Sequence, residues 1–161
     1  MSATQFPFQQ VGDFTITAIS DGNLSASLDL LSNIEPTDAA RMEDEAGVKD
    51  ISAIHINCYL VRGGGRTVLI DAGAGGFKQW GGLLASNLPQ AGVQPSGVDT
   101  ILLTHANPDH VAGLLDKNGE SVFPNAGLVV HKREIEFWQD DGNLSRASER
   151  ARGNFLIARQ I

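Results

Sequence analysis

The sequence has one cysteine and no long apolar run, and each of these features excludes a class of protein. A lone cysteine, Cys58, cannot form an internal disulfide, and its apolar neighbours indicate a small core residue. No apolar run is long enough to span a bilayer, and the first residues lack the basic-then-apolar pattern of a signal peptide. We therefore expect a cytoplasmic protein that does not enter a membrane.

The charge balance is acidic, with a formal net charge of -7 over 161 residues, which argues against a nucleic acid as partner. A composition of 42% hydrophobic and 19% charged residues is that of a globular chain and not of a disordered one. The length suffices for one domain with its own core, and no linker or repeat interrupts the sequence. We expect a single domain over residues 1–161.

Local patterns predict a layered α/β arrangement, in which strands and helices alternate through the second half. Strands are expected at 14–19, 53–61, 67–70, 98–104 and 127–131, the second and third forming a hairpin. Helices are expected at 36–47, 77–88, 108–113, 132–139 and 145–160. Asp21-Gly22-Asn23 is expected to be a turn.

The segment from Thr104 to His110, directly after an apolar strand, carries the densest group of metal-binding side chains. Imidazole and carboxylate are ligands of zinc, iron and manganese, and an amide oxygen is a weaker one. Pro108 keeps the residue before it extended, so side chains two apart face the same way until the chain turns. The segment therefore predicts that four side chains converge on one or two metal ions: His105, Asn107, Asp109 and His110.

The same segment has a second interpretation as the start of a helix. Asn107 suits the cap, Pro108 the first helical position and Asp109 the first turn. Capping leaves His105 and His110 unexplained, and a cap does not exclude a metal site. Both interpretations stand at this point.

Several segments together resemble the metallo-β-lactamase-fold hydrolases. The Thr-His-x-x-x-Asp-His pattern at 104–110 is similar to that family's metal signature. Matching segments occur in the family's order: Asn57-Cys58-Tyr59-Leu60-Val61, Val68-Leu69-Ile70-Asp71-Ala72-Gly73 and Val111-Ala112-Gly113-Leu114. Phe123-Pro124-Asn125-Ala126 and Glu136-Phe137-Trp138 are most similar to the methyl parathion hydrolase-like branch, which is related to the quorum-signal lactonases. The resemblance runs from about Phe14 to the end and implies the N-terminal half of an αββα sandwich.

The resemblance implies a role for each residue of the motif. His105 and position 107 would bind a first metal ion, and Asp109 and His110 a second. Zinc is the expected ion, with iron or manganese as alternatives. Asp109 would also have a catalytic role by orienting the reacting group, and Asp71 would be a buried structural residue near the site. The implied activity is attack by a metal-activated hydroxide on an ester, lactone or organophosphate bond of a small-molecule substrate.

The sequence departs from the family in two ways. Asn107 stands where the family has histidine, which implies a weakened first metal site. The family also takes a third histidine, a bridging aspartate and a final histidine from a later half, and none of these follows His131. An incomplete metal centre and an uncovered sheet face are therefore expected. Two alternatives therefore remain: the chain is a non-catalytic metal-binding or protein-interaction module, or it forms a homodimer that covers the exposed face.

The remaining candidates are interpreted as structural. His55 lies within a strand, where a satisfied structural residue is expected, and His131 lies before a helix, where a surface or capping role is expected. Trp80 and Trp138 are expected to be packing residues. The glycines that follow Asp71 do not form a dinucleotide fingerprint, because Lys78 occupies the position of its third glycine.

Overall fold

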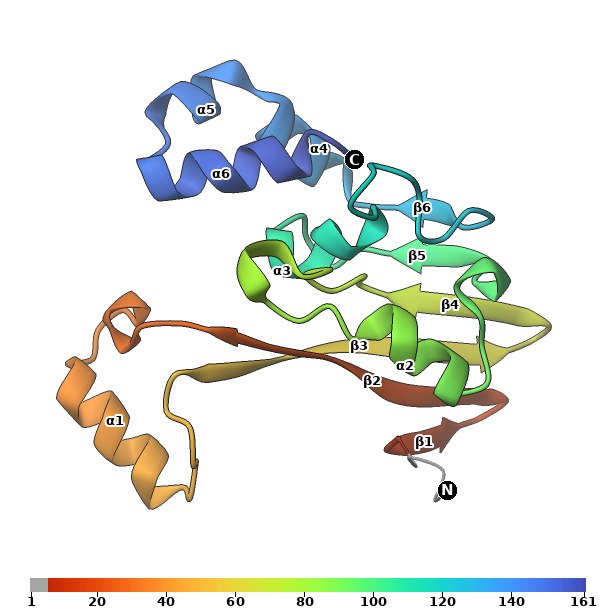
Figure 1. The fold of residues 1–161 in the computed structure, drawn as a ribbon, viewed down its shortest axis with the longest axis horizontal. Coiled ribbons are helices and arrows are strands. Elements are labelled where there is room, and N and C mark those ends of the chain that lie inside the picture. Colours follow the sequence, from red (N-terminus) through yellow and green to blue (C-terminus); the bar gives the residue numbers. More distant parts are fainter. Residues whose placement is uncertain (1–5) are drawn as a thin grey trace.

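The structure, a computed structural model that describes residues 6–161, contains a mixed six-stranded sheet (Figure 1). The strands lie side by side in chain order: β1 (Phe8–Val11), β2 (Phe14–Ser25), β3 (Ala53–Gly63), β4 (Arg66–Ile70), β5 (Thr100–Leu102) and β6 (Gly127–Val129). Strands β1 to β4 pair with one another in antiparallel fashion, whereas β5 pairs parallel to β4 and β6 parallel to β5. The α/β class expected from the sequence is confirmed.

In the described part of the chain, six α-helices accompany the sheet: α1 (Pro36–Glu45), α2 (Leu84–Gln90), α3 (Pro108–Val111), α4 (Lys132–Gln139), α5 (Asp141–Arg146) and α6 (Glu149–Ala158). Helices α2 and α3 pack against the sheet, α4 to α6 gather beyond β6, and α1 follows the long extension of β2 (Figure 1). No helix within residues 6–161 is both long and apolar enough to cross a membrane.

The strand register separates a buried row of side chains from an exposed one. Leu60 pairs with Leu69 and Leu69 with Ile101, and all three are at most 3% exposed. The adjacent row contains Tyr59 and Leu102, whose side chains point to the opposite face because successive residues of a strand alternate. Tyr59 is 43% and Leu102 41% exposed, so this part of the sheet has the uncovered face that was expected.

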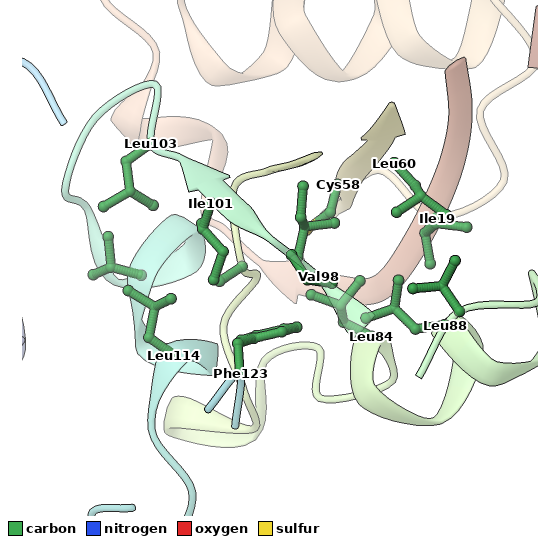
Figure 2. Close-up of a cluster of buried hydrophobic side chains, with 14 residues drawn as sticks. Ile19, Cys58, Leu60, Leu84, Leu88, Val98, Ile101, Leu103, Leu114 and Phe123 are labelled. Atoms are coloured by element: carbon green, nitrogen blue, oxygen red, sulfur yellow. The ribbon is translucent and has the colours of Figure 1, made fainter. Parts of the chain in front are cut away.

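The hydrophobic core lies between the buried row and the helices in front of it (Figure 2). Burying each large aliphatic side chain stabilises the fold by about 1.5–3 kcal/mol relative to leaving it in water. The core holds β5, which precedes the metal-motif segment, and α3, which contains the last residues of that segment. Its residues include Ile19, Cys58, Leu60, Leu69, Leu84, Leu88, Val98, Ile101, Leu103, Val111, Leu114 and Phe123.

The turn expected at Asp21-Gly22-Asn23 is wrong. Strand β2 continues to Ser25 and passes this point through a bulge between Ser20 and Gly22. The side chain of Asp21 is 1% exposed and accepts hydrogen bonds from distant backbone amides, which local sequence signals do not report.

Two expected helices also differ from the structure. The helix expected from residue 77 begins at Leu84, because Gly81 and Gly82 before it have positive φ and break the helical path. The helix expected over 145–160 is divided into the end of α5 and α6. Ser148 starts α6, its hydroxyl accepting a hydrogen bond from the Ala151 amide. Strand β1 was not expected, since Gln9 and Gln10 give it little apolar alternation.

Candidate metal centre

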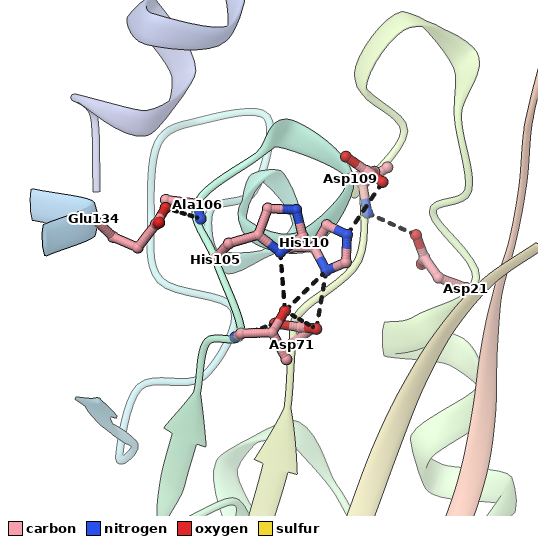
Figure 3. A network of polar contacts seen from close by, with 9 residues as sticks. Asp21, Asp71, His105, Ala106, Asp109, His110 and Glu134 are labelled. Atoms are coloured by element: carbon pink, nitrogen blue, oxygen red, sulfur yellow. Dashed lines mark hydrogen bonds and ion pairs between the residues drawn. The ribbon is translucent and has the colours of Figure 1, made fainter. Parts of the chain in front are cut away.

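The candidate site lies where β4 and β5 end. These strands are parallel, so their carboxyl ends meet at one edge of the sheet. Asp71 directly follows β4, and the motif segment follows β5 (Figure 3). Two backbone hydrogen bonds join them: the Asp71 amide donates to the Leu102 carbonyl at 3.0 Å, and the Ala72 amide donates to the His110 carbonyl at 2.8 Å.

Asp71 and Thr104 form a polar base beneath the two histidines. The Asp71 carboxylate accepts hydrogen bonds from the Thr104 amide and the Thr104 hydroxyl, both at 2.8 Å. It also accepts from His110 Nδ1 at 2.9 Å, while His105 Nδ1 lies 3.1 Å from the Thr104 hydroxyl oxygen. Because the hydroxyl proton goes to Asp71, we assign His105 Nδ1 as the donor. Both Nε2 atoms are thereby left outside this base.

Three of the four predicted side chains lie together. The rings of His105 and His110 have centroids 4.0 Å apart, and His110 Nε2 is 3.3 Å from Asp109 Oδ2. Asn107 is half-buried and extended, as the following proline requires, and occupies the N-cap position of α3. Its side chain makes no capping hydrogen bond. The helix-start interpretation therefore predicted the N-cap position correctly but not the hydrogen bond.

Two carboxylates flank the His110 imidazole and change its charge. Burial alone would lower the pKa of His110, but hydrogen bonds to Asp109 and Asp71 and their charges raise it from 6.5 to about 9. The hydrogen bond with His110 lowers the pKa of Asp109 despite burial. Burial also opposes ionisation of Asp71, yet hydrogen bonds from His110 and Thr104 hold its pKa below the ordinary value. With a pKa of about 9, His110 is an imidazolium at neutral pH and lies between the two carboxylates.

The donor chemistry fits a divalent metal ion in part. The contacts of His105 and His110 through Nδ1 leave Nε2 as the ligand atom, the arrangement that metal-binding histidines ordinarily have. Across residues 6–161, however, no group of three or more His, Cys, Asp or Glu side chains is arranged to hold one ion. Catalytic zinc sites ordinarily use three protein ligands. The candidate residues of this segment therefore supply part of a ligand set and not a whole one.

Asp71 is 5% exposed, which confirms the buried position that the resemblance implied. Its backbone has a φ of 60°, a left-handed conformation that costs a non-glycine residue on the order of 1 kcal/mol. Such strain is retained where the surroundings fix the residue, and here the Thr104 and His110 hydrogen bonds do so.

Sequence reasoning missed two carboxylates that brace the site from outside. Asp21 accepts hydrogen bonds from three amides of the loop after β4, those of Ala74, Gly82 and Leu84, at 2.8 to 3.0 Å. Glu134 of α4 accepts one from the Ala106 amide at 2.9 Å (Figure 3). Both contacts join segments far apart in sequence, and the local signal around Asp21, a glycine and an asparagine after it, indicated a turn instead.

The other two histidines lie on β3 and at the start of α4, and only His131 has the role expected of it. His131 occupies the N-cap of α4, where its Nδ1 accepts a hydrogen bond from the Arg133 amide at 3.2 Å. His55 is exposed on β3. Trp138 is buried against Phe137 and Phe155, which confirms its packing role.

Comparison with known proteins gives consistent matches. The family model described as the metallo-beta-lactamase superfamily matches residues 51–154. A solved structure described as hydrolase AbOPH in the beta lactamase superfamily is 34% identical, with a TM-score of 0.82 over 96% of this chain and 54% of that one. AidC, described as a dizinc quorum-quenching lactonase, is 24% identical, with a TM-score of 0.82 over 100% of this chain and 60% of AidC.

A probable metal-dependent hydrolase from Staphylococcus aureus is 20% identical, with a TM-score of 0.69 over 91% of this chain and 55% of that one. Its likeness and that of AidC concern the fold alone. This chain spans little more than half the length of these three proteins.

Proposed function

Since this chain belongs to the metallo-β-lactamase superfamily, we propose that it is a metal-dependent hydrolase of an ester, lactone or organophosphate bond. The observation that carries the proposal is the base formed by Asp71 and Thr104, which engages Nδ1 of both His105 and His110. A structural ion pair with Asp71 would need only one histidine, whereas this base engages Nδ1 of both and leaves Nε2 of both outside it. The superfamily match and the hydrolase that is 34% identical to this chain support the reaction class.

In this proposal, His105 and Asn107 hold a first ion, and Asp109 and His110 hold a second. Zinc is the proposed metal; when bound, it would supply an activated water and polarise the bond under attack. Asp71 keeps both histidines oriented, directly for His110 and through Thr104 for His105. His110 would release its Nε2 proton on binding a metal ion, so we expect affinity for the ion to rise with pH.

The test measures zinc content of the purified chain and hydrolysis of an activated aryl ester, a lactone and an aryl phosphotriester. Activity that falls with a chelator, returns with zinc and is lost in His110→Ala supports the proposal. His55→Ala is the matched control, because it removes an exposed histidine outside the site. Hydrolysis that survives both the chelator and His110→Ala would contradict the mechanism.

A second candidate function is a non-catalytic metal-binding or protein-interaction module. It is favoured by Asn107 and by the absence, within residues 6–161, of a three-residue group that could hold one ion. Tight zinc binding that depends on His110, together with no turnover of any of the three substrate classes, would favour this function over hydrolysis.

We also propose that two copies associate through the sheet face that carries Tyr59 and Leu102. Both side chains are more than 40% exposed, and covering them would remove apolar area from water. Gel filtration with light scattering across a range of concentrations should give a dimer that Tyr59→Lys dissociates. A monomer at all concentrations would contradict this association.

A further inference from the structure

Glu134 links helix α4 to the metal-motif segment through one carboxylate oxygen. Its Oε2 accepts a hydrogen bond from the Ala106 amide at 2.9 Å and another from Trp138 Nε1 at 3.1 Å. Ala106 lies between His105 and Asn107, so the acceptor reaches the backbone between two candidate ligands (Figure 3). The contact spans 28 residues of sequence, and the second donor comes from one helical turn along α4.

The motif backbone is held from two directions. On the sheet side, Asp71 accepts a hydrogen bond from the Thr104 amide at 2.8 Å. On the α4 side, Glu134 accepts one from the Ala106 amide, two residues along. His105 lies between these anchored amides, so its Cα and its side-chain direction depend on both. The segment from 103 to 107 belongs to no helix or strand, and these contacts replace the hydrogen bonds of regular structure.

The position of Glu134 is itself fixed. Trp138 is buried against Phe137 and Phe155, and its indole N–H donates a hydrogen bond to Glu134 Oε2. Hydrogen bonding from Ala106 lowers the pKa of Glu134, which keeps the acceptor charged at neutral pH. Charged acceptors make stronger hydrogen bonds than neutral ones. If Glu134 served only as the hydrogen-bond acceptor of Trp138, removing it would leave the metal affinity of the motif unchanged.

We propose that Glu134 is a positioning residue of the metal centre, which fixes the Ala106 backbone and so the direction of His105. The inference rests on the proposed function, because it assumes that His105 binds a metal ion. It makes Trp138 a reporter of that site, since the indole and the Ala106 amide share one acceptor atom. Trp80, the only other tryptophan of the chain, serves as an internal reference.

The experiment titrates zinc into the full chain, with calorimetry for affinity and nitrogen–proton correlation spectra for the Ala106 amide and the two indole N–H groups. The variants are Glu134→Ala and Glu134→Gln. Glu136→Ala is the matched control, because Glu136 is exposed on the same helix and pairs only with Lys132 among the salt bridges of residues 6–161. His105→Ala and His110→Ala identify binding of the first and the second ion at the site.

Zinc is expected to shift the Ala106 amide and the Trp138 indole resonances and to leave that of Trp80 in place. Glu134→Ala should weaken zinc binding roughly 10-fold, the lower end for losing an outer partner of a metal ligand. Glu134→Gln should fall between Glu134→Ala and wild type, because its amide oxygen still accepts both hydrogen bonds without the charge. Glu136→Ala should match wild type.

Two failures are distinguishable. Wild-type protein that shows no zinc binding dependent on His105 or His110 would overturn the proposed function and this inference with it. Wild-type protein that binds zinc, with Glu134→Ala binding equally well, would overturn the positioning role alone. If Glu134→Ala does not fold, Glu134→Gln decides: weakened zinc affinity with an otherwise unchanged spectrum supports the inference, and wild-type affinity overturns it.

Discussion

Asp71 Oδ2 lies 2.9 Å from His110 Nδ1, and this single contact determines which ring nitrogen of the histidine faces Asp109. The same carboxylate also accepts both donors of Thr104. Neutralising the Asp71 carboxylate tests how far the stability and the zinc affinity of the site depend on this residue.

Asp71→Asn keeps the size of the side chain but replaces one acceptor oxygen by an NH₂ group. That group must face either the Thr104 amide or the pair of donors at Oδ2, so a buried donor loses its partner. We expect a loss of about 2 kcal/mol in the free energy of unfolding, and zinc binding weaker by roughly 10-fold. Chemical denaturation and calorimetry measure the two effects. Asp13→Asn, at an exposed position, should change neither.

The stability of the metal-free protein should depend on pH through His110. Its pKa is raised to about 9 in the fold from 6.5, so the folded state holds the proton more tightly. The stabilisation is complete below pH 6.5 and is lost as pH rises through 9. Asp71 and Asp109 have lowered pKa values, so their contribution is present above their ordinary values and lost as pH falls.

Denaturation in a chelating buffer from pH 5 to 9 measures this dependence. The free energy of unfolding should decrease between pH 6.5 and 9, and His110→Ala should flatten that decrease. Burial, together with Asp21 and Asp71, raises the pKa of Cys58, whose effect begins only above its ordinary value of 9.0, outside this window. An equal slope in wild type and His110→Ala would contradict the assignment to His110.

The parts of the fold that were predicted from the sequence are those with strong local signals. The hairpin of β3 and β4 alternates apolar side chains around a glycine turn, and α1 and α4 have proline or histidine at their starts. Asp71 was placed by resemblance, and its burial agrees. These predictions needed no knowledge of distant contacts.

The parts that failed depend on contacts across long stretches of sequence. Asp21 looks like a turn residue because glycine and asparagine follow it, but its partners are amides 53 to 63 residues away. Glu134 looks like any charged residue of a helical first turn, and only the packing of α4 brings it to Ala106. For the same reason the convergence of His105 with His110 could be expected from spacing, whereas their shared base of Thr104 and Asp71 could not.

Asn107→His should strengthen zinc binding, because imidazole is a better zinc ligand than a neutral amide. We expect a gain of at least roughly 10-fold, comparable to the smallest effects of changing an outer partner. Asn107 makes no capping hydrogen bond, so stability should fall by less than about 0.5 kcal/mol. Calorimetric zinc titration and denaturation of the same samples measure both quantities.

The two interpretations of Asn107 give opposite results in that experiment. If the residue serves as a cap in solution, Asn107→His and Asn107→Ala both lose about 1 kcal/mol of stability and neither gains affinity. If it stands in a ligand position, only Asn107→His gains affinity. No gain in either variant would favour the non-catalytic function.

The loop that follows β4 should depend on the absence of a side chain at Gly81. Its φ is 52°, and a Cβ added there would overlap the Asp21 carboxylate, which accepts hydrogen bonds from Ala74, Gly82 and Leu84. Gly64 is the matched control: its φ is 56°, so an alanine carries the same backbone cost, but nothing lies within 4 Å of its added Cβ.

Gly81→Ala should therefore lose about 2 kcal/mol more stability than Gly64→Ala, because only the first variant adds overlap to the shared backbone cost. Chemical denaturation of the two variants beside wild type isolates that difference. Moving Asp21 would also free the Ala74 amide, so Gly81→Ala should increase hydrogen exchange at Ala74 while Gly64→Ala leaves it unchanged. Equal stability losses would mean that the loop shifts without disturbing Asp21, and that this carboxylate does not brace the site.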